Sequence, residues 1–395
     1  MGLGSSIGGG KDTYSIPCFF NYIVTSVRMP TIPLHVTLLA PGCFSMIPQT
    51  ESDGSEPPTS SALADLNDAA VRATGTQAYE QALAAALKQA VPDMGALPAA
   101  LYQFPLDAQT TVPQHCVCAE LIHLQADKDN ARLVPEAALD ISSVESQQLL
   151  DSLNQLINAD GLEVQRTPAG RCYLTGMPAT GLDSWPAHAV ANGKIANSLP
   201  RQAEAGDWRR FLTEVQMLFH SHPVNEARAE RGLLPVNGMW FWGGNQSVQI
   251  KPMTDIALVA NDVYAKGLSA TLNLDVENAA SSTWSELEQR YAQNLNINEI
   301  VIVDQAAYDA WLCGDYAALS IAKKRLHERW ITPIQQAVFD GVVAEFVLDG
   351  CEGQAIVEHQ SNQSTANSVG AGLLEKLSLK RFSIKHFFGP KKNKT

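Results

Sequence analysis

The chain has 395 residues, enough to bury one large hydrophobic core or two smaller ones without disulfide or metal staples. Its composition is 45% hydrophobic and 17% charged, which is typical of a globular protein and argues against a disordered or fibrous one. The net charge of -13 at pH 7 argues against a general binder of nucleic acid or of anionic membranes, since those partners select a basic face.

The two ends of the chain differ from the rest in composition. Residues 1–28 are rich in Gly and Ser and show no periodicity, so we expect a disordered extension, with Met29 as an alternative start. Residues 374–395 contain seven Lys or Arg and one Glu, a net of +6, which leaves -19 on the rest of the chain. We expect residues 385–395 to form a solvated basic tail.

The cysteines and the apolar runs bear on the cellular compartment. Seven cysteines are scattered along the chain, mostly inside apolar runs, which predicts buried thiols in a reducing compartment rather than a disulfide framework. No run approaches the about 20 apolar residues that a membrane-spanning helix requires. We therefore expect a cytoplasmic protein.

The first elements in chain order are strands and alanine-rich helices. Residues 34–40 form a short apolar run ended by a Pro-Gly pair, which predicts a buried strand. Residues 62–91 are rich in strong helix formers and break near Gly75, so we expect two helices there. Residues 116–127 are apolar on both sides, as expected of a strand that is covered on both faces.

A capped helix and a hairpin follow. Ser142 and Glu145 have the spacing of a capping box, and the apolar face of the helix that they begin continues to a stop at Gly161. Residues 162–165 and 171–174 then flank a turn and predict a β-hairpin.

The second half of the chain continues the alternation of helices and strands. We expect an amphipathic helix at 207–222, strands at 256–259 and 300–303, a long helix at 319–339 interrupted by Pro333, and a late strand at 342–348. Alternating strands and helices predict an α/β fold in which helices flank a mostly parallel or mixed sheet. We expect this body to span 29–384, with two lobes that divide near 190–206.

The most informative segment, HPVNEARAERGLLPVNGMWFWGG, runs from His222 to Gly244. Its Asn and Arg side chains recur at three-residue spacing, and guanidinium groups donate in pairs to phosphate or carboxylate oxygens. An aromatic strand and a Gly-Gly pair follow, where a backbone can approach a ligand closely. The candidate anion-binding residues are Asn225, Arg228, Arg231, Asn237, Trp240, Trp242, Gly243 and Gly244.

The alternative interpretation of the same segment is structural. Exposed arginines on a helix ordinarily pair with neighbouring acids, here Glu226 and Glu230, and a Trp-Phe-Trp strand is ordinarily part of a core. Periodicity by itself favours this interpretation.

The segment also resembles known families. The order of its Asn, Arg, Gly, Pro and Trp residues is similar to a segment of archaeal-type cofactor-independent phosphoglycerate mutases, and residues 254–269 are more weakly similar to the segment that follows it there. Residues 214–244 and 119–129 resemble the bacterial regulatory proteins of the RpfE type, and that resemblance extends over most of 29–392. It implies a reduced form of the alkaline-phosphatase-like core.

The resemblance also shows what this chain does not share with the mutases. Enzymes of that superfamily use two divalent metals held by Asp and His, and a Ser or Thr nucleophile. The first metal ligand comes from an Asp-Gly pair after the first strand, where this chain has Pro41. The chain also has no Asp-His dipeptide and no Asp followed four residues later by His. We therefore expect no metal site and no cofactor, and we name no catalytic residue.

Three functions remain open at this point. The first is a non-catalytic relative of the mutases, a pseudoenzyme that binds a phosphorylated metabolite or a protein partner in a regulatory role. The second is an active mutase or phosphatase with unrecognised ligands. The third is a purely structural or interaction protein. The oligomeric state is not predicted.

Overall fold

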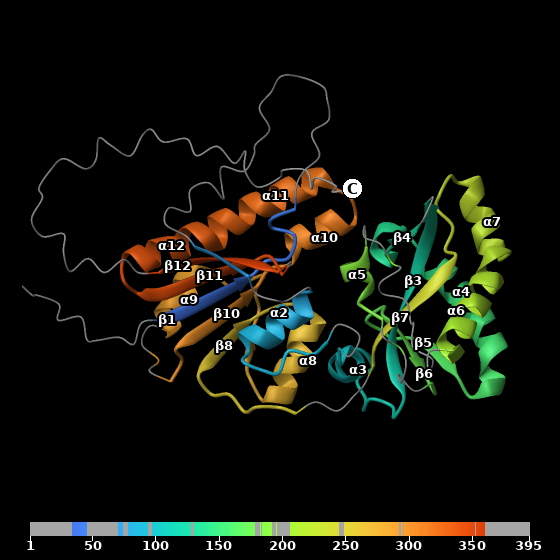
Figure 1. Ribbon diagram of the computed structural model, residues 1–395, viewed down its shortest axis with the longest axis horizontal. Helices are drawn as coiled ribbons and strands as arrows, with labels where there is room; N and C mark the ends of the chain where they lie inside the picture. Colours follow the sequence, from blue (N-terminus) through green and yellow to red (C-terminus); the bar gives the residue numbers. More distant parts are fainter. Residues whose placement is uncertain are drawn as a thin grey trace, which may run out of the picture. The chain divides into compact units, whose positions relative to one another are not determined.

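The computed structural model describes residues 34–45, 70–73, 78–93, 97–127, 130–177, 182, 184–191, 195, 206–244, 249–291, 294, 296–351 and 353–359. The predicted extension 1–28 and basic tail 385–395 lie outside these residues. In the described part, helices flank one mostly parallel sheet and one antiparallel sheet (Figure 1). The predicted fold class is confirmed.

The larger sheet has seven strands in the order β2-β12-β11-β1-β10-β8-β9. Its strands are β1 (Leu34–Leu39), β2 (Ala70–Ala73), β8 (Ile256–Val259), β9 (Val276–Glu277), β10 (Glu299–Val303), β11 (Val343–Asp349) and β12 (Gln354–His359). β1 lies between β10 and β11, and the five strands from β11 to β9 are parallel to one another. The carboxyl ends of these strands therefore meet at one edge, where open α/β sheets bind their ligands.

Helices cover both faces of this sheet. On one face, Leu258 and Val301 pack in a core with α2 (Tyr79–Ala86) and α8 (Val263–Leu272). On the other face, Val259 and Ile300 pack with α9 (Trp284–Tyr291), α11 (Tyr316–Leu326) and α12 (Thr332–Phe339). Strands that are buried on both faces read as continuous apolar runs, which explains why they are recognisable in the sequence.

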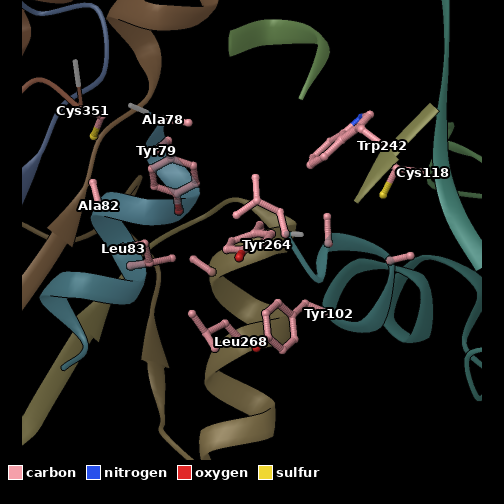
Figure 2. Packing of buried hydrophobic residues seen from close by; sticks show 14 of the residues in the cluster. Ala78, Tyr79, Ala82, Leu83, Tyr102, Cys118, Trp242, Tyr264, Leu268 and Cys351 are labelled. Atoms are coloured by element: carbon pink, nitrogen blue, oxygen red, sulfur yellow. The ribbon is translucent and has the colours of Figure 1, made fainter. Parts of the chain in front are cut away.

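The smaller sheet is antiparallel, with the order β4-β3-β6-β5 and with β7 paired to β3. Its strands are β3 (Cys116–Asp127), β4 (Asn130–Val134), β5 (Glu163–Arg166), β6 (Cys172–Thr175) and β7 (Gly238–Gly244). One face packs on α4 (Ser143–Ile157) and α6 (Gly206–His220), through residues such as Leu121 and Phe241. On the opposite face, Cys118 and Trp240 join the core that contains α2 and α8. α3 (Ala99–Ala108) contributes Phe104 and Tyr102 to that shared core. Figure 2 shows Tyr102 there.

In the sequence, the strands of the smaller sheet come between β2 and β8. The larger sheet therefore combines strands that precede and strands that follow the smaller sheet along the chain. Residues 190–206, where we expect the body to divide, lie between β6 and β7, which belong to one sheet. The described residues all fall in one compact unit by their contacts. The division into two lobes stays a prediction.

Most of the predicted elements are confirmed. They include the strands at 34–40 and 116–127, the hairpin, the helix at 207–222 and the late strands. The capping box is present, since the Ser142 hydroxyl accepts from the Glu145 N–H and the Glu145 carboxylate accepts from the Ser142 N–H. The helix at 319–339 is interrupted by a π-helical turn, His327–Ile331, just before Pro333.

The prediction of two helices within residues 62–91 is wrong in part. Within residues 62–91, the structure has the strand β2 (Ala70–Ala73) and only then the helix α2. β2 pairs antiparallel with β12 at the border of the larger sheet. Helix propensity is a weak preference that tertiary pairing overrides, and the partner strand lies about 280 residues further along the chain.

The cysteines and the helices bear on two further expectations. Five of the six described cysteines are buried, Cys313 is exposed, and none of the six forms a disulfide with another. Among the helices of the described residues, none is both long and apolar enough to cross a membrane.

Candidate functional site

The segment from His222 to Gly244 folds as a short helix, a turn and a buried strand. α7 (Pro223–Glu230) begins at His222, whose Nδ1 accepts a hydrogen bond from the Val224 N–H. The chain turns at Gly232, which has a positive φ, and then enters β7. The aromatic run therefore forms the strand that was expected, and every residue of it is buried.

The two asparagines of the segment bind backbone groups. Asn225 is buried; its Nδ2 donates to the carbonyls of Phe219 (2.7 Å) and Val236 (2.8 Å), and its Oδ1 accepts from the Val236 N–H. Asn237 pairs with both backbone groups of Leu124 on β3. Each amide thus ties two parts of the chain together, which is a structural use of the side chain.

Arg228 is fully buried and all of its bonded donors face protein groups. Its Nε donates to the carbonyl of Leu234 (2.8 Å), and its Nη2 donates to the carbonyl of Leu139 (2.5 Å). Its Nη1 lies 3.3 Å from both the carbonyl of Asp140 and a carboxylate oxygen of Glu145. The guanidinium therefore joins α7 to the loop before α4 instead of facing a cleft.

Arg231 differs from Arg228 in exposure. Its side chain is 53% exposed, and it contacts the same carboxylate of Glu145 and the carbonyl of Ala227. Of the four predicted polar side chains, Asn225, Arg228 and Asn237 thus bind the protein's own groups and do not face one shared cleft. An anion-binding role for the segment stays a prediction, and the geometry gives these side chains a structural role.

The pKa of Glu145 yields a prediction about acid stability. Burial opposes ionisation, but the hydrogen bonds from Ser142 and the charges of Arg231 and Arg228 outweigh it and lower the pKa to about 2. An unfolded Glu titrates near about 4.3. Because the folded-state pKa is depressed, the stabilisation is present above about pH 4.3 and is lost as the pH falls toward 2.

We therefore expect the free energy of unfolding to fall as the pH drops from about 4.3 toward about 2, and to fall less in Glu145→Gln, which keeps the capping spacing. Urea titrations at several pH values measure this. Glu230→Gln, an exposed change on α7, is the control and should follow the parent protein. A parallel fall in Glu145→Gln and the parent would contradict the assignment.

The aromatic and glycine residues of β7 differ in what they contact, and Trp242 lines a cavity. Trp240 is buried and its indole N–H donates to the carbonyl of Trp185 (2.8 Å). Trp242 donates to Glu120 (2.6 Å) and lines a cavity. Gly243 has a φ of +58°, and a Cβ at this position would lie 2.6 Å from the Cβ of Ala99. The absence of a side chain therefore allows β7 to approach α3. Gly244 is the last residue of the strand. Of the predicted site residues, Trp242 alone lines this cavity.

The cavity has a volume of about 720 Å³ and lies at the carboxyl ends of β8 and β10. Its walls are α2, α3 and α8, the strands β3, β6 and β7, the short helix α5 (Ala187–Val190), and α10 (Ala306–Leu312) with the loop before it. Both the size and the position are typical of small-molecule sites in α/β proteins.

A partly buried histidine lies among carboxylates in this cavity. The Nε2 of His188 lies 3.2 Å from a carboxylate oxygen of Glu80, whose side chain is buried. Burial lowers the pKa of His188, but the charges of Glu80, Glu120 and Asp309 outweigh it and raise the pKa above its usual value. His188 also makes edge contacts with the rings of Trp242 and Tyr308.

Three further carboxylates of the cavity have raised pKa values. Burial raises the pKa of Glu120, although His188 and the Trp242 N–H oppose it. Burial likewise raises the pKa of Asp262, which caps α8 and accepts a hydrogen bond from the Tyr79 hydroxyl (2.7 Å). Burial and neighbouring carboxylates raise the pKa of Asp309. A cluster of shifted groups in one cleft marks a candidate functional site.

The carboxylates at the sheet edge outside the cavity accept hydrogen bonds from the protein's own groups. Asp304 accepts from the Ala306 N–H and from the indole of Trp330. Asp349 is buried and accepts from the Cys351 N–H (2.7 Å). Throughout the described part of the chain, no three His, Cys, Asp or Glu side chains are placed to hold a metal ion.

Sequence reasoning missed Glu80, Glu120, His188 and Asp262. One signal was available: Glu120 is a charged residue inside the apolar strand 116–127, and buried charges are rare without a function or a partner. The others lie on separate elements far apart in the chain, so no local pattern joins them.

Comparisons relate part of this chain to phosphoglycerate mutases. A family model described as 2,3-bisphosphoglycerate-independent phosphoglycerate mutase matches residues 109–225. The chain is 22% identical over 180 residues to a probable mutase of that type from Geobacter sulfurreducens, and 34% identical over 58 residues to one from Methanothrix thermoacetophila. The first match covers 41% of this chain and 42% of that protein, and the second covers 15% of each.

A solved cofactor-independent phosphoglycerate mutase from Thermoplasma acidophilum has a TM-score of 0.31 and 15% identity to this chain, over 84% of this chain and 90% of that one. The family model and the two curated relatives, not this structure, relate the chain to the cofactor-independent phosphoglycerate mutases by its sequence. The aligned parts span less than half of either curated relative's length. The similarity to RpfE-type regulatory proteins stays a prediction.

Proposed function

We propose that this chain is a phosphoglycerate-mutase-related protein that lacks the two-metal catalytic site and acts as a regulatory, ligand-binding protein. The observation that carries the proposal is the carboxyl edge of the larger sheet. β1 ends before Pro41, and Asp304 and Asp349 each bond the backbone of their own loop. Such a donor set does not fit two divalent metals, because each metal needs several converging ligands.

The position of the family match supports the same proposal. Residues 109–225 contain β3 to β6 with α4 and α6, which belong to the smaller sheet and its helices. The parallel strands β1, β8, β10 and β11 lie outside the match. The residues that the family model matches therefore do not include the strands whose carboxyl edge would have to supply the chemistry.

The cavity supports the ligand-binding half of the proposal. It lies at the sheet edge, it is lined by both sheets and their helices, and it contains the shifted groups His188, Glu120 and Asp262. A ligand there contacts elements from distant parts of the chain, so its binding stabilises the folded state by mass action. A cytoplasmic location is part of this proposal.

Measurements of metal content and turnover test the proposed lack of a two-metal catalytic site. Purified protein incubated with Mn²⁺ and Zn²⁺ and then desalted should retain well under one metal per chain in elemental analysis. An assay that interconverts 3- and 2-phosphoglycerate, with an active mutase as positive control, should show no turnover. Stoichiometric metal together with turnover would overturn the proposal and identify an active enzyme.

A further inference from the structure

We propose that the cavity binds a small organic cation, a protonated amine, held by carboxylates and aromatic rings. This inference rests on the proposed function, because it names the ligand class of the same cavity. It differs from the phosphorylated metabolite that the sequence suggests.

The charges that line the cavity are the first argument. The carboxylates are Glu80, Glu120, Asp262 and Asp309, together with Asp107 and Glu136. Arg171 donates two hydrogen bonds to Asp107, at 2.6 and 2.7 Å, and Arg166 pairs with Glu136. The four remaining carboxylates face His188 and the exposed Lys266, so four negative and two positive groups leave an excess of two negative charges.

Glu120 offers an acceptor that the protein does not use. One carboxylate oxygen accepts the Trp242 indole N–H at 2.6 Å, and no donor among the described residues bonds the other. The charge of His188 favours the ionised form of Glu120, but the Nε2 of His188 is paired with the neighbouring Glu80. A cation beside Glu120 would compensate a carboxylate whose charge is only partly compensated now.

An unpartnered hydroxyl is an independent sign of a ligand. Tyr264 is 3% exposed and lines the cavity, yet its hydroxyl has no hydrogen-bond partner among the residues that the structure describes. Figure 2 shows it on α8, with Tyr79 on α2 and Trp242 on β7. The oxygen atom is not among the buried polar atoms that lack a partner, so it is open to the cavity, where a ligand can donate a hydrogen bond to it.

The recognition chemistry suits an ammonium group. An ammonium has three donors and no acceptor, which matches carboxylate and phenol oxygens. The rings of Trp242, Tyr264 and Tyr308 also line the cavity, and aromatic faces attract cations. A phosphate group in the same place would face an excess of carboxylates and is disfavoured.

Calorimetric titration with putrescine tests the inference, with 1,4-butanediol as an uncharged compound of the same length. We expect the full-length protein to bind putrescine and to bind neither butanediol nor 3-phosphoglycerate at that cavity. Glu120→Gln should weaken putrescine binding about tenfold or more, since it removes the charge and keeps an oxygen for the Trp242 N–H. Because burial already disfavours the charged form of Glu120, this variant should fold with the thermal midpoint of the parent.

Glu230→Gln, the same change at an exposed position on α7, is the matched control and should bind putrescine as the parent does. Equal binding of putrescine and butanediol, no binding of putrescine, or equal weakening in the two variants would overturn the inference. Its failure is distinguishable from that of the proposed function, since metal content and mutase turnover are measured without any amine.

Discussion

Arg228→Met is expected to lower the free energy of unfolding by about 3 to 5 kcal/mol, the range found when one partner is removed from a buried ion pair. The guanidinium is fully buried and bonds the carbonyls of Leu234 and Leu139 as well as the carboxylate of Glu145. Methionine fills similar space but leaves these acceptors without a donor. Because a folded domain is stable by only about 5 to 15 kcal/mol, urea-induced unfolding should show a large shift.

Arg231→Met is the matched control for that experiment. Its side chain contacts the same Glu145 but is 53% exposed, so its loss should cost no more than about 1 kcal/mol. A thermal shift with 3-phosphoglycerate on each variant separates the two interpretations of the segment. If Arg228→Met unfolds like the parent but loses a shift that the parent shows, the anion-binding interpretation is correct and the structural one is wrong.

Gly267→Ala is expected to destabilise the protein by about 3 kcal/mol, at the upper end of the range for overpacked cores. A Cβ on Gly267 would lie 2.0 Å from the carbonyl oxygen of Tyr102, so α3 and α8 would have to move apart. The rings of Tyr102 and Tyr264 pack edge to face at 5.4 Å across this contact. Since Tyr264 lines the cavity, the variant should also weaken putrescine binding.

Gly206→Ala is the control for this prediction. Gly206 begins α6, and a Cβ there would meet nothing within 4 Å. The stability should stay within about 0.5 kcal/mol of the parent, as for other surface changes. If Gly267→Ala and Gly206→Ala have the same unfolding free energy, the close approach of α3 to α8 is wrong.

The elements that the sequence predicts correctly are those with local causes. The helix after Ser142 is set by its capping box and an apolar face, and the hairpin at 162–174 by its turn. The strands at 256–259 and 300–303 are apolar because helices cover both faces. Each signal is contained within about 15 residues, the length over which periodicity is informative.

Alanine-rich residues 70–73 show where such local reasoning fails. They have helical composition, but they add a strand beside β12, which lies at the other end of the chain. Hydrogen bonds to that partner decide the conformation, and composition does not report them.

The sequence by itself determined the α/β class and most of the helices and strands, and it pointed to phosphoglycerate mutases, to which a family model relates residues 109–225. Only the tertiary structure decided what the polar residues of the segment His222–Gly244 do: Asn225 and Arg228 bond carbonyls that folding brings to them. The cavity likewise exists only after folding, because Glu80, Glu120 and His188 come from three separate elements. The energy of a buried charge depends on its neighbours in space, and the order of residues along the chain does not contain them.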